Sequence, residues 1–283
     1  MRLVLSHGNG LAIEGYRCFW EALTDEFEVV VFDLRNHGRS GNSALAHHTI
    51  ARFAEDMEFV WRTLNAELGP KTSIGVFHSV SALAGLLHQS QRSRWHGLVL
   101  VEPPIAPPPA HALRATHLAE IAQMGAAARR RRAVFAAPSE LAERLQKSLA
   151  FRLVGSDELA LLAEALLTMR DDGTYGLACL PQYEAQIFET NTVTDAWDAL
   201  NALCIPVQLL CSDPALTGVQ STAFIGQAVA SELCIDYQRI SKTSHLLQIE
   251  NPQACREAVR AFVAKRLSTY PLNSRQNGGQ IST

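Results

Sequence analysis

Six short apolar runs recur along the chain, and their alternation with helical segments constrains the fold more than any other feature. The runs lie at 2–7, 28–33, 73–79, 97–103, 207–213 and 235–241. Runs without polar alternation are typical of strands buried on both faces of a parallel sheet. Segments with helical spacing lie between or beside them, at 13–24, 49–68, 79–89, 218–230 and 252–266. This pattern predicts a doubly wound, mostly parallel α/β sheet of about six strands.

One long interval interrupts the alternation. Residues 103–202 show helical periodicity without a convincing strand, and they open with the proline-rich segment PPIAPPPA, a stiff connection. We therefore expect residues 1–102 and 203–267 to form the core domain. Residues 103–202 are expected to form a helical cap over the carboxyl edge of the sheet. The polar, aperiodic residues 268–283 are expected to be a disordered tail.

Composition limits the partners that the chain can have. The 283 residues carry 25 Lys and Arg against 28 Asp and Glu, a formal net charge of −3, which predicts no general attraction to nucleic acid or anionic membranes. No apolar stretch reaches the ~20 residues of a membrane span, and the opening run is too short for a signal peptide. None of the six cysteines forms a CxxC pair. We expect a reduced, cytoplasmic protein whose partner is a small molecule.

A serine stands where the third apolar run meets the following helical segment, in the stretch GVFHSVS at 75–81. A nucleophile elbow places its serine, here Ser79, on such a turn with Oγ exposed above the sheet. The turn is crowded two residues before and two residues after the nucleophile, so small residues are expected there. Ser81 meets this requirement, whereas Phe77 departs from the usual G-x-S-x-G pattern. A helix N-cap is the alternative role of Ser79.

The first apolar run leads into His7-Gly8-Asn9-Gly10. A loop in this position can supply one backbone N–H of an oxyanion hole, and the residue after the nucleophile supplies the other. We therefore predict an oxyanion hole made by the N–H groups of Asn9 and Val80. Each donor can contribute ~3 kcal/mol to transition-state stabilisation. An ordinary glycine turn is the alternative.

These motifs, together with DLRNHGRS at 33–40, resemble the α/β-hydrolase superfamily over residues 6–267. The resemblance implies that 33–40 buttresses the floor of the site and that His37 is a structural loop histidine. Many members carry an antiparallel strand pair before the first motif strand. Because the sequence starts directly at that strand, we expect a sheet of about six strands without the pair. The chemistry implied needs neither metal nor cofactor.

The resemblance places a catalytic histidine at His245, within KTSHLLQIENP. Ser244 replaces the glycine common before it, while Glu250 and Pro252 fit the usual pattern. Imidazole suits a general base because its ordinary pKa near 6.5 lets it accept and return a proton at neutral pH.

Two residues compete for the acid that orients this histidine. Asp213 ends the run at 207–213 and follows the usual chain order of serine, acid and histidine, so we favour it. A turn or capping role is its alternative. Glu102, at the end of the run at 97–103, is the rival acid, because some superfamily members place the acid there. Either residue would stabilise the imidazolium.

Two further groups are assigned no catalytic role. The pair His47-His48 is predicted to face solvent rather than to bind a metal. The run Arg129–Arg132 lies in the predicted cap and is interpreted as a solvated helix face. Its alternative is a carboxylate-binding arginine above the site.

The combination of Ser79, Asp213 and His245 predicts a serine hydrolase that cleaves a small to medium acyl substrate through an acyl-enzyme. A carboxylic ester is the default substrate. A thioester, or a diketone-like compound cleaved at a C–C bond, would need the same triad. Serine at the nucleophile position argues against dehalogenases and epoxide hydrolases of this fold, which use aspartate. A noncatalytic ligand-binding protein on the same fold is the alternative from another class.

Overall fold

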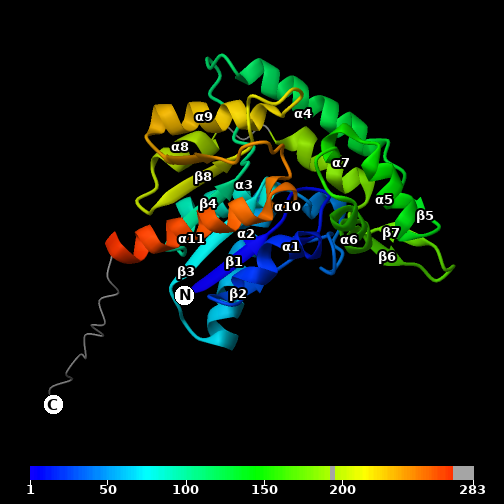
Figure 1. Cartoon of the computed structure of the whole chain (residues 1–283), viewed down its shortest axis with the longest axis horizontal. Helices are drawn as coiled ribbons and strands as arrows, with labels where there is room; N and C mark the ends of the chain where they lie inside the picture. The colour runs from blue at the N-terminus through cyan, green and yellow to red at the C-terminus, as the bar shows by residue number, and fades with distance from the viewer. Residues whose placement is uncertain (192–194, 270–283) are drawn as a thin grey trace.

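The computed structural model describes residues 1–191 and 195–269. A six-stranded sheet in the order β2-β1-β3-β4-β8-β9 lies at its centre (Figure 1), and every neighbouring pair is parallel. The strands are β1 (Arg2–Ser6), β2 (Glu28–Val31), β3 (Ser73–His78), β4 (Gly97–Val101), β8 (Val207–Cys211) and β9 (Asp236–Arg239). The predicted α/β sheet of six parallel strands is confirmed.

Burial of the strands follows their place in the sheet. Every residue of β1, β3 and β4 is buried, whereas the edge strands β2 and β9 are half-buried or exposed. Along β1, Leu3 and Leu5 join one apolar cluster and Val4 joins another on the opposite face. This period of two, with apolar residues on both faces, is why the central runs showed no polar alternation.

Helices cover both faces of the sheet. The core helices are α1 (Arg17–Trp20), α2 (Ile50–Leu68), α3 (Val80–Arg92), α8 (Asp195–Asn201), α9 (Ser221–Leu233), α10 (Leu247–Glu250) and α11 (Pro252–Thr269). One face packs on α2, α3, α8 and α9, and the other on α1 and α11. The segment predicted as one helix at 13–24 is a succession of short turns instead, η1 (Ile13–Tyr16), α1 and η2 (Glu21–Leu23).

The interval predicted as a cap contains α4 (Arg114–Arg129), α5 (Pro138–Gln146), η4 (Leu149–Phe151), α6 (Ser156–Leu166) and α7 (Pro181–Thr190). It also contains a small antiparallel sheet that the sequence did not predict, formed by β5 (Val134–Phe135), β6 (Leu167–Met169) and β7 (Tyr175–Leu177). Strands of two or three residues are too short to show a period of two. Figure 1 shows these elements, in green, gathered at one end of the central sheet.

Two sequence expectations concern the limits of the chain. Within residues 1–191 and 195–269, no helix is long and apolar enough to cross a membrane. Of the expected tail, residues 268 and 269 belong to the end of α11, and 270–283 lie outside the described residues.

The direction in which successive strands are added to the sheet reverses after β2. From β1 the chain passes outward to β2 and then returns to β3 on the other side of β1. In open parallel sheets, ligand sites form at such a switch point, outside the carboxyl ends of the strands. The loop after β1 and the serine after β3 therefore meet at one place, and the functional residues are found there.

Candidate active site

Ser79 lies on the sharp turn between β3 and α3. Its backbone adopts φ 54° and ψ −121°, a strained conformation for a residue with a side chain. Ser81 fastens the turn, because its Oγ accepts from the His78 N–H at 2.9 Å and donates to the His78 carbonyl at 2.8 Å. Strain that a surrounding structure holds in place is typical of a nucleophile elbow.

Phe77, the departure from the usual elbow pattern, is accommodated by two glycines. Its ring lies against Gly75 and Gly85, where an added Cβ would come within 2.4 Å of it. The ring also packs edge-on against Trp95, with 5.4 Å between the ring centroids. The usual pattern avoids crowding with a small residue at position 77. Here Gly85, in the first turns of α3, leaves room for the larger ring instead.

His245 connects Ser79 to an acid. Its Nε2 lies 3.1 Å from Ser79 Oγ, and its Nδ1 lies 3.1 Å from Glu102 Oε2. The Glu102 side chain is fully buried at the end of β4, while that of His245 is 14% exposed. The geometry is that of a nucleophile, a base and an orienting acid in series.

Glu102 is held by donors from the end of β8 and the start of α9. Its Oε1 accepts from the Ser212 N–H at 2.7 Å and from Ser212 Oγ at 3.0 Å. Its Oε2 also accepts from Thr222 Oγ1, besides its contact with His245. A buried carboxylate needs such partners, because leaving it unpaired is costly. With both oxygens bonded to fixed groups, the acid has one orientation toward the imidazole.

Asp213, the acid favoured from the sequence, is engaged elsewhere, and this preference is corrected. Its carboxylate accepts from the N–H groups of Lys242 at 3.0 Å and Ala215 at 3.1 Å, and these bonds lower its pKa. Arg239 lies 3.5 Å away. The described contacts of His245 include Glu102 but not Asp213. Asp213 therefore has the role of a turn residue between β8 and the loop before His245.

Asn9 and Val80 border the same cavity as Ser79. Among the hydrogen bonds of residues 1–191 and 195–269, neither N–H has an acceptor, so both are free to bind an oxyanion. The Asn9 side chain is fixed by donation to the Glu184 carbonyl at 2.9 Å. Gly8 permits the close approach of this loop, because a Cβ there would lie 2.9 Å from His78 Nδ1 and 3.1 Å from Ser79 Cβ.

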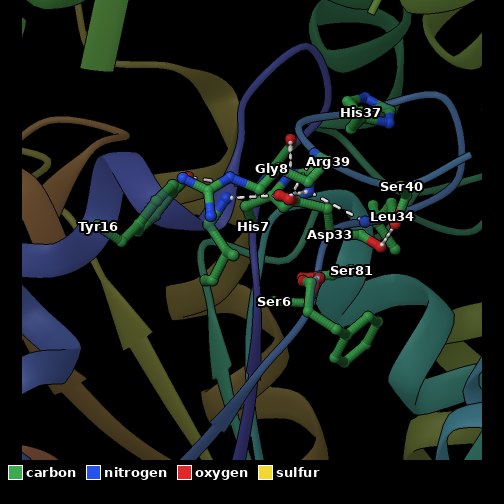
Figure 2. A network of polar contacts seen from close by, with 12 residues as sticks. Ser6, His7, Gly8, Tyr16, Asp33, Leu34, His37, Arg39, Ser40 and Ser81 are labelled. Carbon is green, nitrogen blue, oxygen red and sulfur yellow. Dashed lines mark hydrogen bonds and ion pairs between the residues drawn. The ribbon is translucent and has the colours of Figure 1, made fainter. Parts of the chain in front are cut away.

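The loop after β2 supports the loop after β1 (Figure 2). The Leu34 N–H donates to His7 Nε2 at 3.1 Å, and His7 Nδ1 then donates to the Gly8 carbonyl at 2.8 Å. Asp33 accepts from the N–H groups of Ile13 at 2.8 Å and Arg39 at 2.9 Å. The segment 33–40 thus holds the active-site floor through hydrogen bonds, which agrees with the structural role that the sequence indicated for it.

A second buried chain of hydrogen bonds was missed in the sequence. The Gly8 N–H donates to Tyr16 Oη at 3.3 Å, and Tyr16 Oη donates to His78 Nδ1 at 2.6 Å. The Nε2 of His78 donates to the His245 carbonyl at 2.9 Å. Burial, and then the charge of His245, lowers the pKa of His78, so the ring is neutral as this pattern requires. These bonds tie the loop after β1, the end of β3 and the loop that carries His245 together.

The residues around His245 follow the sequence pattern with one useful difference. Ser244 donates through both its N–H and its Oγ to the Glu250 carboxylate. Burial raises the pKa of Glu250, and the two hydrogen bonds oppose that rise. The serine in place of the usual glycine therefore fastens the loop that carries the histidine.

A cavity of about 610 Å³ lies over Ser79 and His245. Gly8, Asn9, Val80 and Leu246 line it beside Ser79, and most of its remaining lining comes from residues 104–191, on and between α4, α5, η4 and α7. The lining is mainly apolar, with Ile121, Met124, Phe135, Leu141, Leu145, Phe151, Ile187 and Phe188. The interval predicted as a cap thus covers the candidate nucleophile.

One buried cluster has the donor atoms of a metal site but not the hydrogen-bond pattern of one. Ligand-capable atoms of His37, His48 and Cys179 lie within 4.8 Å of one another. Both ring nitrogens of His37 are engaged, Nε2 by the Gly10 N–H at 3.0 Å and Nδ1 by the Arg35 carbonyl at 2.8 Å. The Asn36 amide donates to His48 Nδ1, which places the ring proton on Nε2. These residues therefore serve as a packed polar contact between core and cap.

Two expectations from the sequence hold for only some of their residues. His47 is exposed as predicted, but His48 is fully buried, because it packs against Phe53 and Tyr183. Within the arginine run, Arg129 and Arg130 are exposed, whereas Arg131 and Arg132 border the cavity. The run is thus only partly a solvated face.

Comparison with known proteins agrees with this architecture. A sequence model of the alpha/beta hydrolase family matches residues 3–258. No curated protein sequence matches the chain. An E-2-(acetamidomethylene)succinate hydrolase superimposes with a TM-score of 0.75 at 17% identity, covering 93% of this chain and 91% of that one. The thioesterase domain from the curacin biosynthetic pathway gives 0.70 at 17% identity, covering 92% and 90%. A thermophilic esterase from Thermogutta terrifontis gives 0.65 at 20% identity, covering 94% and 90%.

Proposed function

We propose, on the premise that this chain belongs to the alpha/beta hydrolase family, that it is a serine hydrolase that cleaves an acyl substrate through an acyl-enzyme. The observation that carries the proposal is the series Ser79, His245 and Glu102, with 3.1 Å at each of its two contacts. A structural serine would need no base, and the base would need no buried acid behind it. Nucleophilic catalysis requires all three groups in this arrangement.

Each residue has a defined part in this mechanism. Ser79 Oγ attacks the substrate carbonyl while His245 Nε2 accepts the hydroxyl proton. Glu102 fixes the imidazole orientation and stabilises the imidazolium that forms. The N–H groups of Asn9 and Val80 bind the oxyanion of the tetrahedral intermediate. His245 then returns the proton to the leaving group, and water hydrolyses the acyl-enzyme by the same steps.

A carboxylic ester is the substrate class that we propose first. The mainly apolar cavity of about 610 Å³ suits an acyl group of small to medium size. Similar folds are carried by an esterase and by a thioesterase domain. A thioester, or a diketone cleaved at a C–C bond, would use the same residues and is therefore an outcome of a substrate screen. We also propose that the partner of this protein is its small-molecule substrate and that the protein acts in the cytoplasm.

Turnover of nitrophenyl esters of increasing acyl length tests the proposal. Ser79→Ala should abolish hydrolysis at every length, because no other hydroxyl contacts His245 in the described residues. Ser90→Ala is a matched control, since Ser90 is an exposed serine on α3 whose hydroxyl donates to the Leu87 carbonyl. If Ser79→Ala keeps the wild-type rate, as Ser90→Ala should, the proposed nucleophile is wrong. A wild-type protein that binds the esters but turns none of them over would favour the ligand-binding role.

A further inference from the structure

The cap side of the cavity carries an excess of positive charge. Four cations border it, Arg131, Arg132, Arg144 and Lys147, against the two carboxylates of Glu120 and Glu184. The whole chain has a formal net charge of −3, so the excess is a local property of the cavity. An excess of one charge sign in a cavity wall favours ligands of the opposite sign.

Two of these cations are already neutralised by neighbours. Arg131 forms an ion pair with Glu184, and Arg132 forms one with Glu140. The carboxylate of Glu120 is also occupied, because it accepts from both the N–H and the Oγ of Ser221. The neutral serine leaves the charge of Glu120 in place, so one carboxylate of the lining has no cationic partner in the described residues. The two remaining cations, Arg144 and Lys147, outnumber it.

Arg144 and Lys147 have no ion-pair partner among residues 1–191 and 195–269. Each follows a glutamate by four residues, a spacing at which helical ion pairs form. Glu140 instead bonds to Arg132 and to the Ala136 N–H. Glu143 borders a different hollow, next to α6, rather than the cavity over Ser79. The two cations thus line the cavity without the partners that their sequence offers.

The positions of the two cations suit one ligand group. Residues 144 and 147 are three apart at the end of α5, so their side chains share one face of that helix end. Leu141 and Leu145 on the same helix line the cavity as well. A substrate with an apolar body and a negatively charged end would therefore contact the leucines along its length and the cations at its end.

We propose that the substrate carries an anionic group, a carboxylate or a phosphate, which Arg144 and Lys147 bind while its acyl carbon lies at Ser79. This inference rests on the proposed function and specifies its substrate class. Both cations are exposed, so their attraction is screened by salt. The selectivity for an anionic substrate should therefore decline as ionic strength rises.

Three nitrophenyl esters of equal chain length test the proposal, ending in a methyl group, a carboxylate or a phosphate. The wild-type protein should prefer an anionic ester, through a lower KM. The double variant Arg144→Gln with Lys147→Gln should raise the KM for that ester about tenfold and leave the methyl ester unchanged. The ester that responds identifies carboxylate or phosphate as the ligand. Arg129→Gln is the control, because Arg129 pairs with Glu189 outside the cavity lining and should change neither KM.

A binding measurement separates this inference from the proposed function. Calorimetry on Ser79→Ala protein, with the amide analogue of each ester, reports binding without turnover. The anionic analogue should bind about tenfold more weakly once Arg144 and Lys147 are replaced. If wild type and double variant show the same preference in both assays, or if the methyl compound binds as well as the anionic ones, the anionic subsite is wrong. An inactive protein that still shows the charge preference would overturn the hydrolase mechanism alone.

Discussion

His245 and Glu102 meet at the carboxyl edge of the sheet, with Nδ1 of the imidazole 3.1 Å from Oε2 of the carboxylate. Glu102 follows β4, the strand hydrogen-bonded to β3, which leads into Ser79. The next strand, β8, contributes Ser212, whose N–H and Oγ both bond to Glu102. The end of β8, where the sequence analysis placed the acid at Asp213, thus supplies the donors that hold Glu102 at the end of β4.

Substitution of the two acids should have opposite outcomes. Glu102→Gln should lower kcat by a factor of up to ~10⁴, because the imidazolium loses its charged partner. Asp213→Asn should leave kcat within a few fold of wild type, since Asp213 bonds to backbone N–H groups of its own turn. Steady-state kinetics on a nitrophenyl ester measure both. A large loss in Asp213→Asn with an intact fold by circular dichroism, and none in Glu102→Gln, would return the acid to Asp213.

The loop after β1, which carries the proposed oxyanion donor Asn9, should not tolerate a side chain at position 8. In Gly8→Ala the new Cβ would lie 2.9 Å from His78 Nδ1, so the loop must shift and carry the Asn9 N–H with it. Misplacing one oxyanion donor should lower kcat by ~10²–10³ with a smaller change in KM. Gly41→Ala is the control, because a Cβ there meets no atom within 4 Å. Equal kcat values for the two variants would show that this loop takes no part in the reaction.

Tyr16→Phe tests the buried hydrogen-bond chain. Loss of the hydroxyl leaves the Gly8 N–H and His78 Nδ1 without their partner. We expect the free energy of unfolding in urea to fall by about 1–3 kcal/mol, the usual cost of a buried unpaired polar group. kcat should fall as well, because the chain reaches the His245 carbonyl. Tyr175→Phe, at a half-buried tyrosine in the small cap sheet, serves as the control. A fully stable Tyr16→Phe protein would contradict the account of this chain.

His48 should make the protein less stable at mildly acidic pH. Its ordinary pKa is 6.5, and burial, followed by the charge of Arg35, lowers it to about 4 in the folded protein. Between these values the unfolded chain binds a proton that the folded protein does not, so stability present above pH 6.5 is lost as pH falls toward 4. His48→Gln should therefore reduce the dependence of unfolding free energy on pH between 7 and 4.5. His47→Gln, at an exposed residue, should not. Identical slopes in all three proteins would rule out this contribution.

The strand pattern and the elbow could be predicted from sequence because each depends on local signals. Apolar runs mark strands buried on both faces, and the serine at a strand-to-helix junction marks the turn. The choice between Glu102 and Asp213 could not be made this way. Both acids follow neighbouring parallel strands, so both reach the same edge of the sheet, and only side-chain direction separates them.

Other features depend on contacts between distant parts of the chain. Phe77 fits at the elbow because Gly85 in the next helix leaves room for its ring. His48 is buried because Tyr183 of the cap packs over it. The hydrogen bond from Tyr16 to His78 joins residues 62 positions apart. None of these contacts has a local sequence signature, although a histidine directly before the predicted nucleophile was a signal that could have been followed.

The central claim is that Ser79 is a nucleophile activated by His245, and covalent labelling tests it most directly. The protein should react with a fluorophosphonate probe, and tandem mass spectrometry of the digested protein should place one adduct on Ser79. Ser79→Ala protein should remain unlabelled, and Glu102→Gln protein should be labelled much more slowly, because its imidazole lacks the charged partner. An unlabelled wild-type protein, or an adduct on any residue other than Ser79, would contradict the account.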